Sequence, residues 1–183
     1  MKHLIKQAIC IALLTVSSTA LSLEVGDKAP AFNLQASDGK TYSLEQFLGK
    51  QAIVIAWYPK AFTSGCTIEC KSLAQNGHLV REYDVTYFMA SVDSLEKNTA
   101  FAESTEADFP LLSDPSKEVA KAYDVLALYG YPKRHTIYIG KEGKILMIDR
   151  EINPGTSAED MAANLGRLGI PKVAELNAGL STL

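Results

Sequence analysis

The chain has 183 residues, of which 47% are hydrophobic and 21% are charged, and its formal net charge is −3 at pH 7. This size and hydrophobic share suit one domain with a substantial core. The slight acidic excess offers nothing to a polyanion, so we expect neither nucleic acid nor a membrane among the partners.

The first residues have the pattern of a secretory signal peptide. Lys2 and Lys6 form a basic start, and an apolar run at 8–16 is followed by small residues. The run is short for a membrane span, although an uncleaved anchor is the alternative. We therefore expect 1–22 to be a cleaved signal peptide and 23–183 to be one domain of a periplasmic or secreted bacterial protein.

Apolar runs and turn signals along the rest of the chain predict alternating strands and helices. The expected strands cover residues 31–34, 41–43, 52–58, 85–92, 109–112, 135–139 and 145–148. The expected helices cover residues 44–47, 64–82, 95–105, 117–123 and 157–168, and the last of these is expected to be the final element. This order predicts an α/β fold with an N-terminal β-hairpin and a mixed central sheet that has helices on both faces.

The most informative segment is WYPKAFTSGCTIEC, which follows an apolar, β-branched run at 52–56. Pro59 ends the predicted strand, and a helix can begin near Ser64, which places Cys66 in the first helical turn at the C-terminal edge of the sheet. Catalytic groups gather at that edge in open α/β sheets. Unpaired backbone N–H groups and the positive end of the helix dipole favour a thiolate there. Cys66 is therefore predicted to be a reactive cysteine.

This segment resembles the active-site loop of the peroxiredoxins. Pro59, Thr63 and Cys66 fill their signature Pro-x-x-x-Thr-x-x-Cys, and YPKAFTSGCT is similar to the bacterioferritin-comigratory, or PrxQ-like, branch of the AhpC/TSA family. The resemblance covers about 23–169 and includes a downstream arginine, Arg134. It implies a thioredoxin-like fold, a thiol-dependent peroxidase activity, and no cofactor or metal.

The resemblance implies a role for each matching side chain. Cys66 would attack one oxygen of the peroxide, while Thr63 would hydrogen-bond the sulfur or the peroxide and Arg134 would hold a positive charge beside both. Pro59 would shield the site from water. Thr63 as a simple helix cap and Arg134 as a surface residue are the structural alternatives.

Two neighbours of Cys66 complete the expected site. The backbone N–H group of Gly65 would add a neutral donor beside that of Cys66. Glu69 resembles the family glutamate that orients the arginine, and its alternative is a solvated acid favoured by the helix dipole.

Cys70 is the tentative resolving cysteine. Residues four apart on a helix have Cβ atoms about 5–6 Å apart, whereas a disulfide needs about 3.5–4.5 Å. Cys66 and Cys70 are therefore close but cannot be bridged until the helix unwinds, as the family resemblance implies. Resolution by a partner thiol is the alternative. Ser64 stands where these relatives usually have proline.

Three function classes follow. The first is a thiol peroxidase that reduces hydrogen peroxide and organic hydroperoxides, takes electrons from a thioredoxin-like or other thiol reductant, and is a monomer by resemblance. The second is a Cu(I)-binding protein similar to the Sco-type assembly factors, which would use Cys66, Cys70 and His135. The third is a thioredoxin-like reductase, and the absence of a Cys-x-x-Cys motif argues against it.

Overall fold

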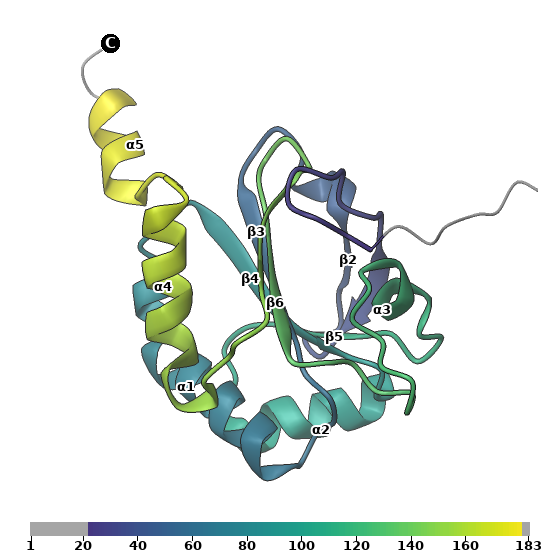
Figure 1. The fold of residues 1–183 in the computed structure, drawn as a ribbon. Helices are drawn as coiled ribbons and strands as arrows, with labels where there is room; N and C mark the ends of the chain where they lie inside the picture. The colour runs from purple at the N-terminus through teal and green to yellow at the C-terminus, as the bar shows by residue number, and fades with distance from the viewer. Residues whose placement is uncertain (1–21, 181–183) are drawn as a thin grey trace, which may run out of the picture.

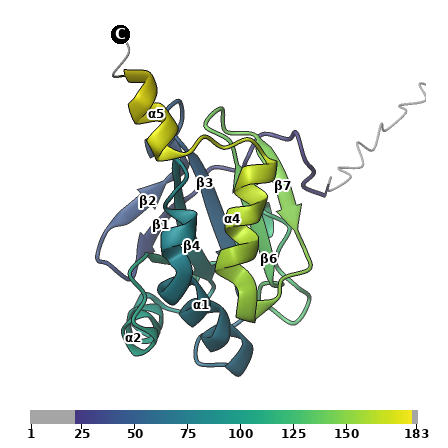
Figure 2. The same cartoon turned by 90° about the vertical axis from the view of Figure 1, so that its left-hand side faces the viewer.

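The computed structural model describes residues 22–180, so the predicted signal peptide lies, except for Ser22, outside the described residues. Two views of the fold show a central sheet with helices packed against it (Figures 1 and 2). The strands are β1 (Asn33–Ala36), β2 (Thr41–Ser43), β3 (Ala52–Trp57), β4 (Val85–Ser91), β5 (Leu111–Ser113), β6 (His135–Ile139) and β7 (Ile145–Asp149). The helices are α1 (Ser64–Val80), α2 (Leu95–Thr105), α3 (Glu118–Ala122), α4 (Ser157–Arg167) and α5 (Val173–Leu180), with short 3-10 helices η1 (Leu44–Gln46) and η2 (Pro154–Thr156).

The strands form one mixed sheet in the order β2-β1-β5-β4-β3-β6-β7. Strands β3, β4 and β5 are parallel, whereas β6 runs antiparallel to β3 and forms a hairpin with β7. Trp57, the last residue of β3, pairs with His135, the first residue of β6. This register brings the loop after β3 next to the segment before β6.

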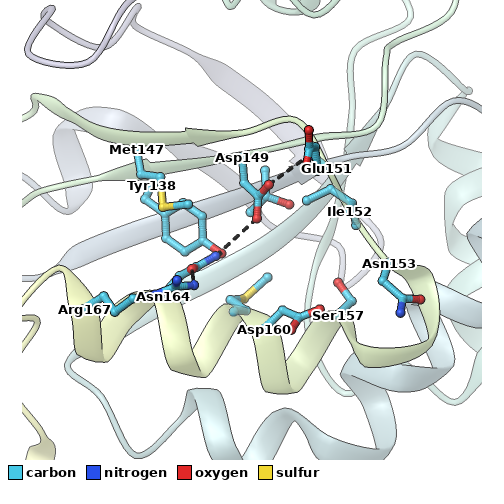
Figure 3. A pocket seen from close by; sticks show the side chains of 12 residues that line it. Tyr138, Met147, Asp149, Glu151, Ile152, Asn153, Ser157, Asp160, Asn164 and Arg167 are labelled. Atoms are coloured by element: carbon cyan, nitrogen blue, oxygen red, sulfur yellow. Dashed lines mark hydrogen bonds between the residues drawn. The ribbon is translucent and has the colours of Figure 1, made fainter.

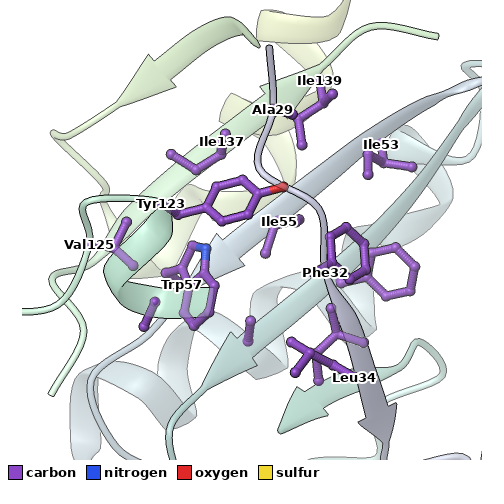
Figure 4. Packing of buried hydrophobic residues seen from close by; sticks show 14 of the residues in the cluster. Ala29, Phe32, Leu34, Ile53, Ile55, Trp57, Tyr123, Val125, Ile137 and Ile139 are labelled. Carbon is purple, nitrogen blue, oxygen red and sulfur yellow. The ribbon is translucent and has the colours of Figure 1, made fainter. Parts of the chain in front are cut away.

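The two faces of the sheet carry separate hydrophobic clusters because successive side chains of a strand point to opposite faces. Ile53, Ile55 and Trp57 belong to the cluster under α3 and the N-terminal segment. Figure 4 shows this cluster, with Tyr123 lying over the strands, where its hydroxyl donates to the carbonyl of Pro30 at 2.7 Å. The opposite cluster contains residues of α1, α2 and α4, and Figure 2 shows α1 and α4 side by side across that face.

The predicted α/β fold, with its N-terminal hairpin and helices on both faces, is confirmed. Strand β1 begins at Asn33, two residues later than predicted, and α1 ends at Val80, two residues earlier. The expectation that the helix near 157–168 is the final element is wrong, because α5 follows it. No helix in the described part of the chain is long and apolar enough to cross a membrane.

Helix α5 projects from the body of the domain (Figures 1 and 2). Its start is fixed by contacts that are distant in sequence: the N–H of Val173 donates to the carbonyl of Glu82, and the N–H of Asp84 donates to the carbonyl of Pro171. The ammonium of Lys172 also donates to Glu82 at 2.8 Å. A short helix stabilised in this way leaves little periodic signal in the sequence.

Candidate active site

Contacts with the sheet and with α2 hold the loop that follows β3 in place. The N–H of Tyr58 donates to the carbonyl of Ala90 at 2.9 Å, and the N–H of Ala61 donates to the buried carboxylate of Asp93 at 2.8 Å. Phe62 then adopts a positive φ of 65°, which is unusual for a bulky residue. Its ring packs edge-on against Phe101 of α2, with the ring centroids 5.2 Å apart. The half-buried Pro59 lies at the start of this loop.

Helix α1 begins directly after the loop, as predicted, and Cys66 is its third residue. The N–H of Thr67 donates to the carbonyl of Thr63 at 2.9 Å. The preceding N–H groups of Gly65 and Cys66 have no acceptor within the described residues, as is usual in the first turn of a helix. Cys66 is a free, buried thiol in this first turn.

Arg134 lies against this sulfur although it is 68 residues away in sequence. One guanidinium nitrogen, Nη2, is 3.2 Å from Sγ of Cys66, and the other, Nη1, pairs with the carboxylate of Glu69. The planar guanidinium therefore bridges two groups that stand three residues apart on α1. A lysine could not make both contacts, because its ammonium is a single point charge.

Glu69 is completely buried, so the alternative prediction of a solvated acid at this position is wrong. Its Oε2 pairs with Arg134, and its Oε1 has no hydrogen-bond partner among the described residues. Burial raises the pKa of Glu69 to about 7, and the nearby Arg134 opposes this shift only in part. The structure thus places Glu69 where it can orient the arginine.

Gly65 provides the room for that arginine. A Cβ atom at this position would stand 3.2 Å from Nη2 of Arg134. This distance is tighter than ordinary van der Waals contact, so any larger residue here would press on the guanidinium.

Thr63 occupies the N-cap position of α1, but its side chain does not cap the helix. The hydroxyl instead donates to the carbonyl of Lys60 at 2.9 Å, and no bond to the sulfur of Cys66 is formed. The only proton of the hydroxyl is used in that bond, so its lone pairs are free to accept. Thr63 can therefore receive a hydrogen bond from the O–H of a peroxide.

Cys70 lies one turn further along α1 and is also a free, buried thiol. Its sulfur is 3.1 Å from Oγ1 of Thr105, at the end of α2. Burial raises the pKa of Cys70 to about 11. Because α1 is unbroken from Ser64 to Val80, the two cysteines are held one helical turn apart.

Sequence reasoning missed the polar residues that support the loop. Asp93 accepts from Ala61 and pairs with Lys97 at 2.5 Å, and the buried Asn98 accepts from the hydroxyl of Tyr58 at 2.7 Å. The spacing of Asp93 and Lys97 is the i, i+4 spacing of a helical ion pair, which is the one signal that could have indicated the pair. Nothing local indicates that Asn98 is buried.

His135 does not join the cysteines. It is the first residue of β6 and pairs with Trp57, whose side chain belongs to the cluster on one face of the sheet, whereas Cys66 and Cys70 belong to the cluster on the opposite face. The described residues contain no group of three or more histidine, cysteine or acidic side chains arranged to hold a metal ion. The three residues that the copper hypothesis requires are therefore not brought together.

A separate polar cavity of about 280 Å³ lies between the β6–β7 hairpin and α4 (Figure 3). Asn164 organises it: its amide donates to the hydroxyl of Tyr138 at 2.9 Å and to the carboxylate of Asp149 at 3.2 Å. Arg167 donates in turn to the carbonyl oxygen of the Asn164 side chain. This network fastens α4 to the hairpin and includes neither cysteine.

Comparisons with known proteins identify the family. Residues 25–148 match the model of the AhpC/TSA family. The chain is 34% identical over 139 residues to "Peroxiredoxin Bcp" of Bacillus subtilis, a match that covers 72% of this chain and 88% of the relative. It is 37% identical over 103 residues to "Peroxiredoxin Bcp" of Escherichia coli, covering 56% of this chain and 65% of that relative.

Solved structures show the same fold. "Peroxidoxin BcpB" from Mycobacterium tuberculosis superimposes with a TM-score of 0.71 at 29% identity, covering 79% of this chain and 97% of that one. A PrxQ mutant from Xylella fastidiosa has a TM-score of 0.74 at 23% identity, covering 81% and 99%, and supports the fold alone. The similarity to the Sco-type proteins is not supported. The chain belongs to the AhpC/TSA family, in its bacterioferritin-comigratory, PrxQ-like branch of peroxiredoxins.

Proposed function

We propose that this peroxiredoxin reduces hydrogen peroxide and organic hydroperoxides with Cys66 as the peroxidatic residue. The observation that carries the proposal is the 3.2 Å contact between Nη2 of Arg134 and Sγ of Cys66 at the N-terminus of α1. A sulfur held there faces a permanent cation and free backbone donors, which together stabilise a thiolate and the negative charge that develops on a leaving oxygen.

The proposed first step is a displacement at oxygen. The thiolate of Cys66 attacks one peroxide oxygen, the O–O bond breaks, and the other oxygen leaves with the electron pair and takes a proton. The cysteine is thereby oxidised to a sulfenic acid, and the peroxide is reduced to water or an alcohol. Thr63 accepts from the peroxide O–H, Arg134 stabilises the leaving oxygen, and Pro59 limits the access of water.

The proposed second step returns the sulfur to its reduced state. Cys70 attacks the sulfenic acid after α1 unwinds locally, or a partner thiol does so in its place. A thioredoxin-like or other thiol reductant then reduces the resulting disulfide. The site uses protein side chains and backbone groups throughout.

The test is the mass of the reduced protein within a second of adding about one equivalent of hydrogen peroxide. A fast loss of two hydrogens at Cys66 and Cys70 supports a peroxidase with an internal resolving cysteine. A fast gain of one oxygen on Cys66 supports a peroxidase that needs a partner thiol. No fast change in the wild type would refute the proposal, and Cys66→Ser is the unreactive control.

We further propose that the protein is exported to a bacterial periplasm and acts there as a monomer. The basic start, short apolar run and small residues at 1–22 support export. The test is expression of the full chain in a bacterial host, followed by the intact mass of the periplasmic protein. A mass that begins near Leu23 supports cleavage, and an uncleaved, membrane-associated chain contradicts it. Gel filtration of the cleaved protein tests the monomer.

A further inference from the structure

Three bonds hold the helical segment that contains both cysteines in place. Arg134 contacts Cys66 and Glu69 from the side of β6. Thr105 contacts Cys70 from the side of α2. Because Cys66 and Cys70 cannot be bridged while α1 is intact, these bonds must open before a disulfide can form.

The direction of the bond to Cys70 follows from the other partners of Thr105. The hydroxyl oxygen of Thr105 lies 2.7 Å from the carbonyl of Phe101 and 3.2 Å from that of Ala102. A carbonyl can only accept, so the single hydroxyl proton of Thr105 is committed to these carbonyls. The oxygen then accepts from the S–H of Cys70. Cys70 is therefore held as a neutral thiol whose proton points to α2.

The three bonds respond differently to peroxide. Oxidation converts the Cys66 thiolate into a neutral sulfenic acid, which weakens its attraction to Arg134. The bond between Cys70 and Thr105 involves neither the reacting sulfur nor the cation, so oxidation leaves it unchanged. Like the pair between Arg134 and Glu69, which oxidation of Cys66 also leaves in place, it must be broken by thermal motion.

Thr105 also borders a cavity of about 230 Å³ between α1 and α2. The residues that line this cavity are Lys71, Ala74, Gln75, Ser104, Thr105 and Glu106. Cys70 is completely buried and does not line it, so Thr105 separates the sulfur from this space.

We propose that Thr105 is a positioning residue that retains Cys70 beside α2 and thereby slows the step in which Cys70 resolves the sulfenic acid. This inference rests on the proposed peroxidase function. The controlled step is the attack of the Cys70 sulfur on the sulfenic sulfur of Cys66: the S–S bond forms, the S–O bond breaks, and the hydroxide leaves with the Cys70 proton as water. No additional oxidant is needed beyond the peroxide of the first step.

The experiment follows oxidation of the full mature protein by rapid quenching and mass measurement, so that sulfenic acid formation and loss of water are timed separately. Thr105→Val removes the hydroxyl and keeps the shape of the side chain. It should accelerate disulfide formation about fivefold, the factor that one ordinary hydrogen bond represents. The rate of sulfenic acid formation should not change.

Ser104→Ala is the matched control. The hydroxyl of Ser104 donates to the same Phe101 carbonyl at 2.9 Å, but it does not contact Cys70. This variant should resolve at the wild-type rate, and so should Thr105→Ser, which keeps the hydroxyl. Thr105→Ala also removes the hydroxyl and should accelerate resolution. It provides a second hydroxyl-free variant if Thr105→Val does not fold.

Three outcomes would overturn the inference. Resolution of the hydroxyl-free variants at or below the wild-type rate would show that Thr105 does not retain Cys70. An equal acceleration in Ser104→Ala would assign the effect to general loosening of α2. Fast sulfenic acid formation without any disulfide in the wild type would remove the step itself while leaving the peroxidase intact. A wild type that does not react with peroxide at all would instead refute the proposed function.

Discussion

The guanidinium of Arg134 lies over Gly65, at a position where a Cβ atom on the glycine would stand 3.2 Å from Nη2. The first turn of α1 and the segment before β6 can therefore approach this closely because Gly65 has no Cβ atom. The arginine can reach Sγ of Cys66 only because that space is open.

Gly65→Ala should therefore lower activity without lowering stability. The added methyl group displaces the guanidinium, and we expect the rate of sulfenic acid formation to fall about tenfold, since small misplacements of catalytic groups are costly. The free energy of unfolding should not fall, because alanine is favoured over glycine in a helix by about 1 kcal/mol. Stopped-flow kinetics and urea unfolding measure the two effects.

Gly155→Ala is the control for this substitution. A Cβ at Gly155 would be 3.6 Å from the nearest atom, an ordinary van der Waals distance. Its peroxide kinetics should match the wild type. An unchanged rate in Gly65→Ala would show that the guanidinium does not need this space.

Arg134→Lys should lower the rate of peroxide reduction by about a hundredfold, the usual effect of losing one donor to a developing oxyanion. Lysine keeps the charge but cannot contact Glu69 and Cys66 together. The measurement is the second-order rate constant with hydrogen peroxide. The control is Arg81→Lys, because Arg81 is engaged with Tyr87 and Asp108 away from the cysteines. Wild-type kinetics in Arg134→Lys would mean that charge alone is sufficient.

Glu69→Gln should change the dependence of stability on pH. Burial raises the pKa of Glu69 from its ordinary value of 4.5 to about 7, so between these values the folded protein binds this proton more readily than the unfolded chain. Relative to Glu69→Gln, the wild type should lose stability as the pH rises through this window and change little above it. Urea unfolding at a series of pH values measures the difference.

Glu82→Gln provides the contrast. The exposed Glu82 pairs with Lys172, which lowers the pKa of Glu82. The effect of Glu82 on the pH dependence of stability is therefore opposite to that of Glu69, because the stability that Glu82 contributes is lost as the pH falls through the acid range. A difference between wild type and Glu69→Gln that is flat with pH would show that burial does not raise the pKa of Glu69.

Asp93→Ala should destabilise the protein by about 2 kcal/mol, because the buried N–H of Ala61 loses its acceptor. The loop before Cys66 would lose the bond that ties Ala61 to Asp93, so we also expect a severalfold slower reaction with peroxide. Equilibrium unfolding and stopped-flow kinetics measure both effects. Asp108→Ala removes an exposed carboxylate that is paired with Arg81, and it should cost less than about 1 kcal/mol. Equal effects of the two substitutions would contradict the supporting role of Asp93.

The strand-loop-helix unit around Cys66 could be predicted because its signals are local. The β-branched run of β3, the break at Pro59 and the helix that begins at Ser64 all lie within 13 residues of one another. The role of the Thr63 side chain as a helix cap was predicted as an alternative and is wrong, because its hydroxyl turns back to the carbonyl of Lys60. A capping hydroxyl oxygen accepts from an N–H of the first helical turn, whereas this hydroxyl is oriented to donate to the carbonyl of Lys60, and the sequence does not decide between these two orientations.

Contacts between distant segments could not be derived in the same way. The meeting of Arg134 with Cys66 depends on the pairing of Trp57 with His135, and only the family pattern pointed to that arginine. The contact between Cys70 and Thr105 had no signal at all, because it depends on how α1 and α2 approach each other above the sheet.

The sequence by itself determined the α/β class, the position of Cys66 in the first turn of a helix, and the one-turn separation of the two cysteines, since each follows from residue types at short spacing. Only the tertiary structure decided that Glu69 is buried beside Arg134, that Gly65 accommodates this arginine, and that Thr105 contacts Cys70. The physical reason is the distance along the chain over which each interaction acts. Backbone preferences and helical periodicity act over a few residues, whereas burial and hydrogen bonding of these groups depend on strands and helices that the chain brings together over long distances.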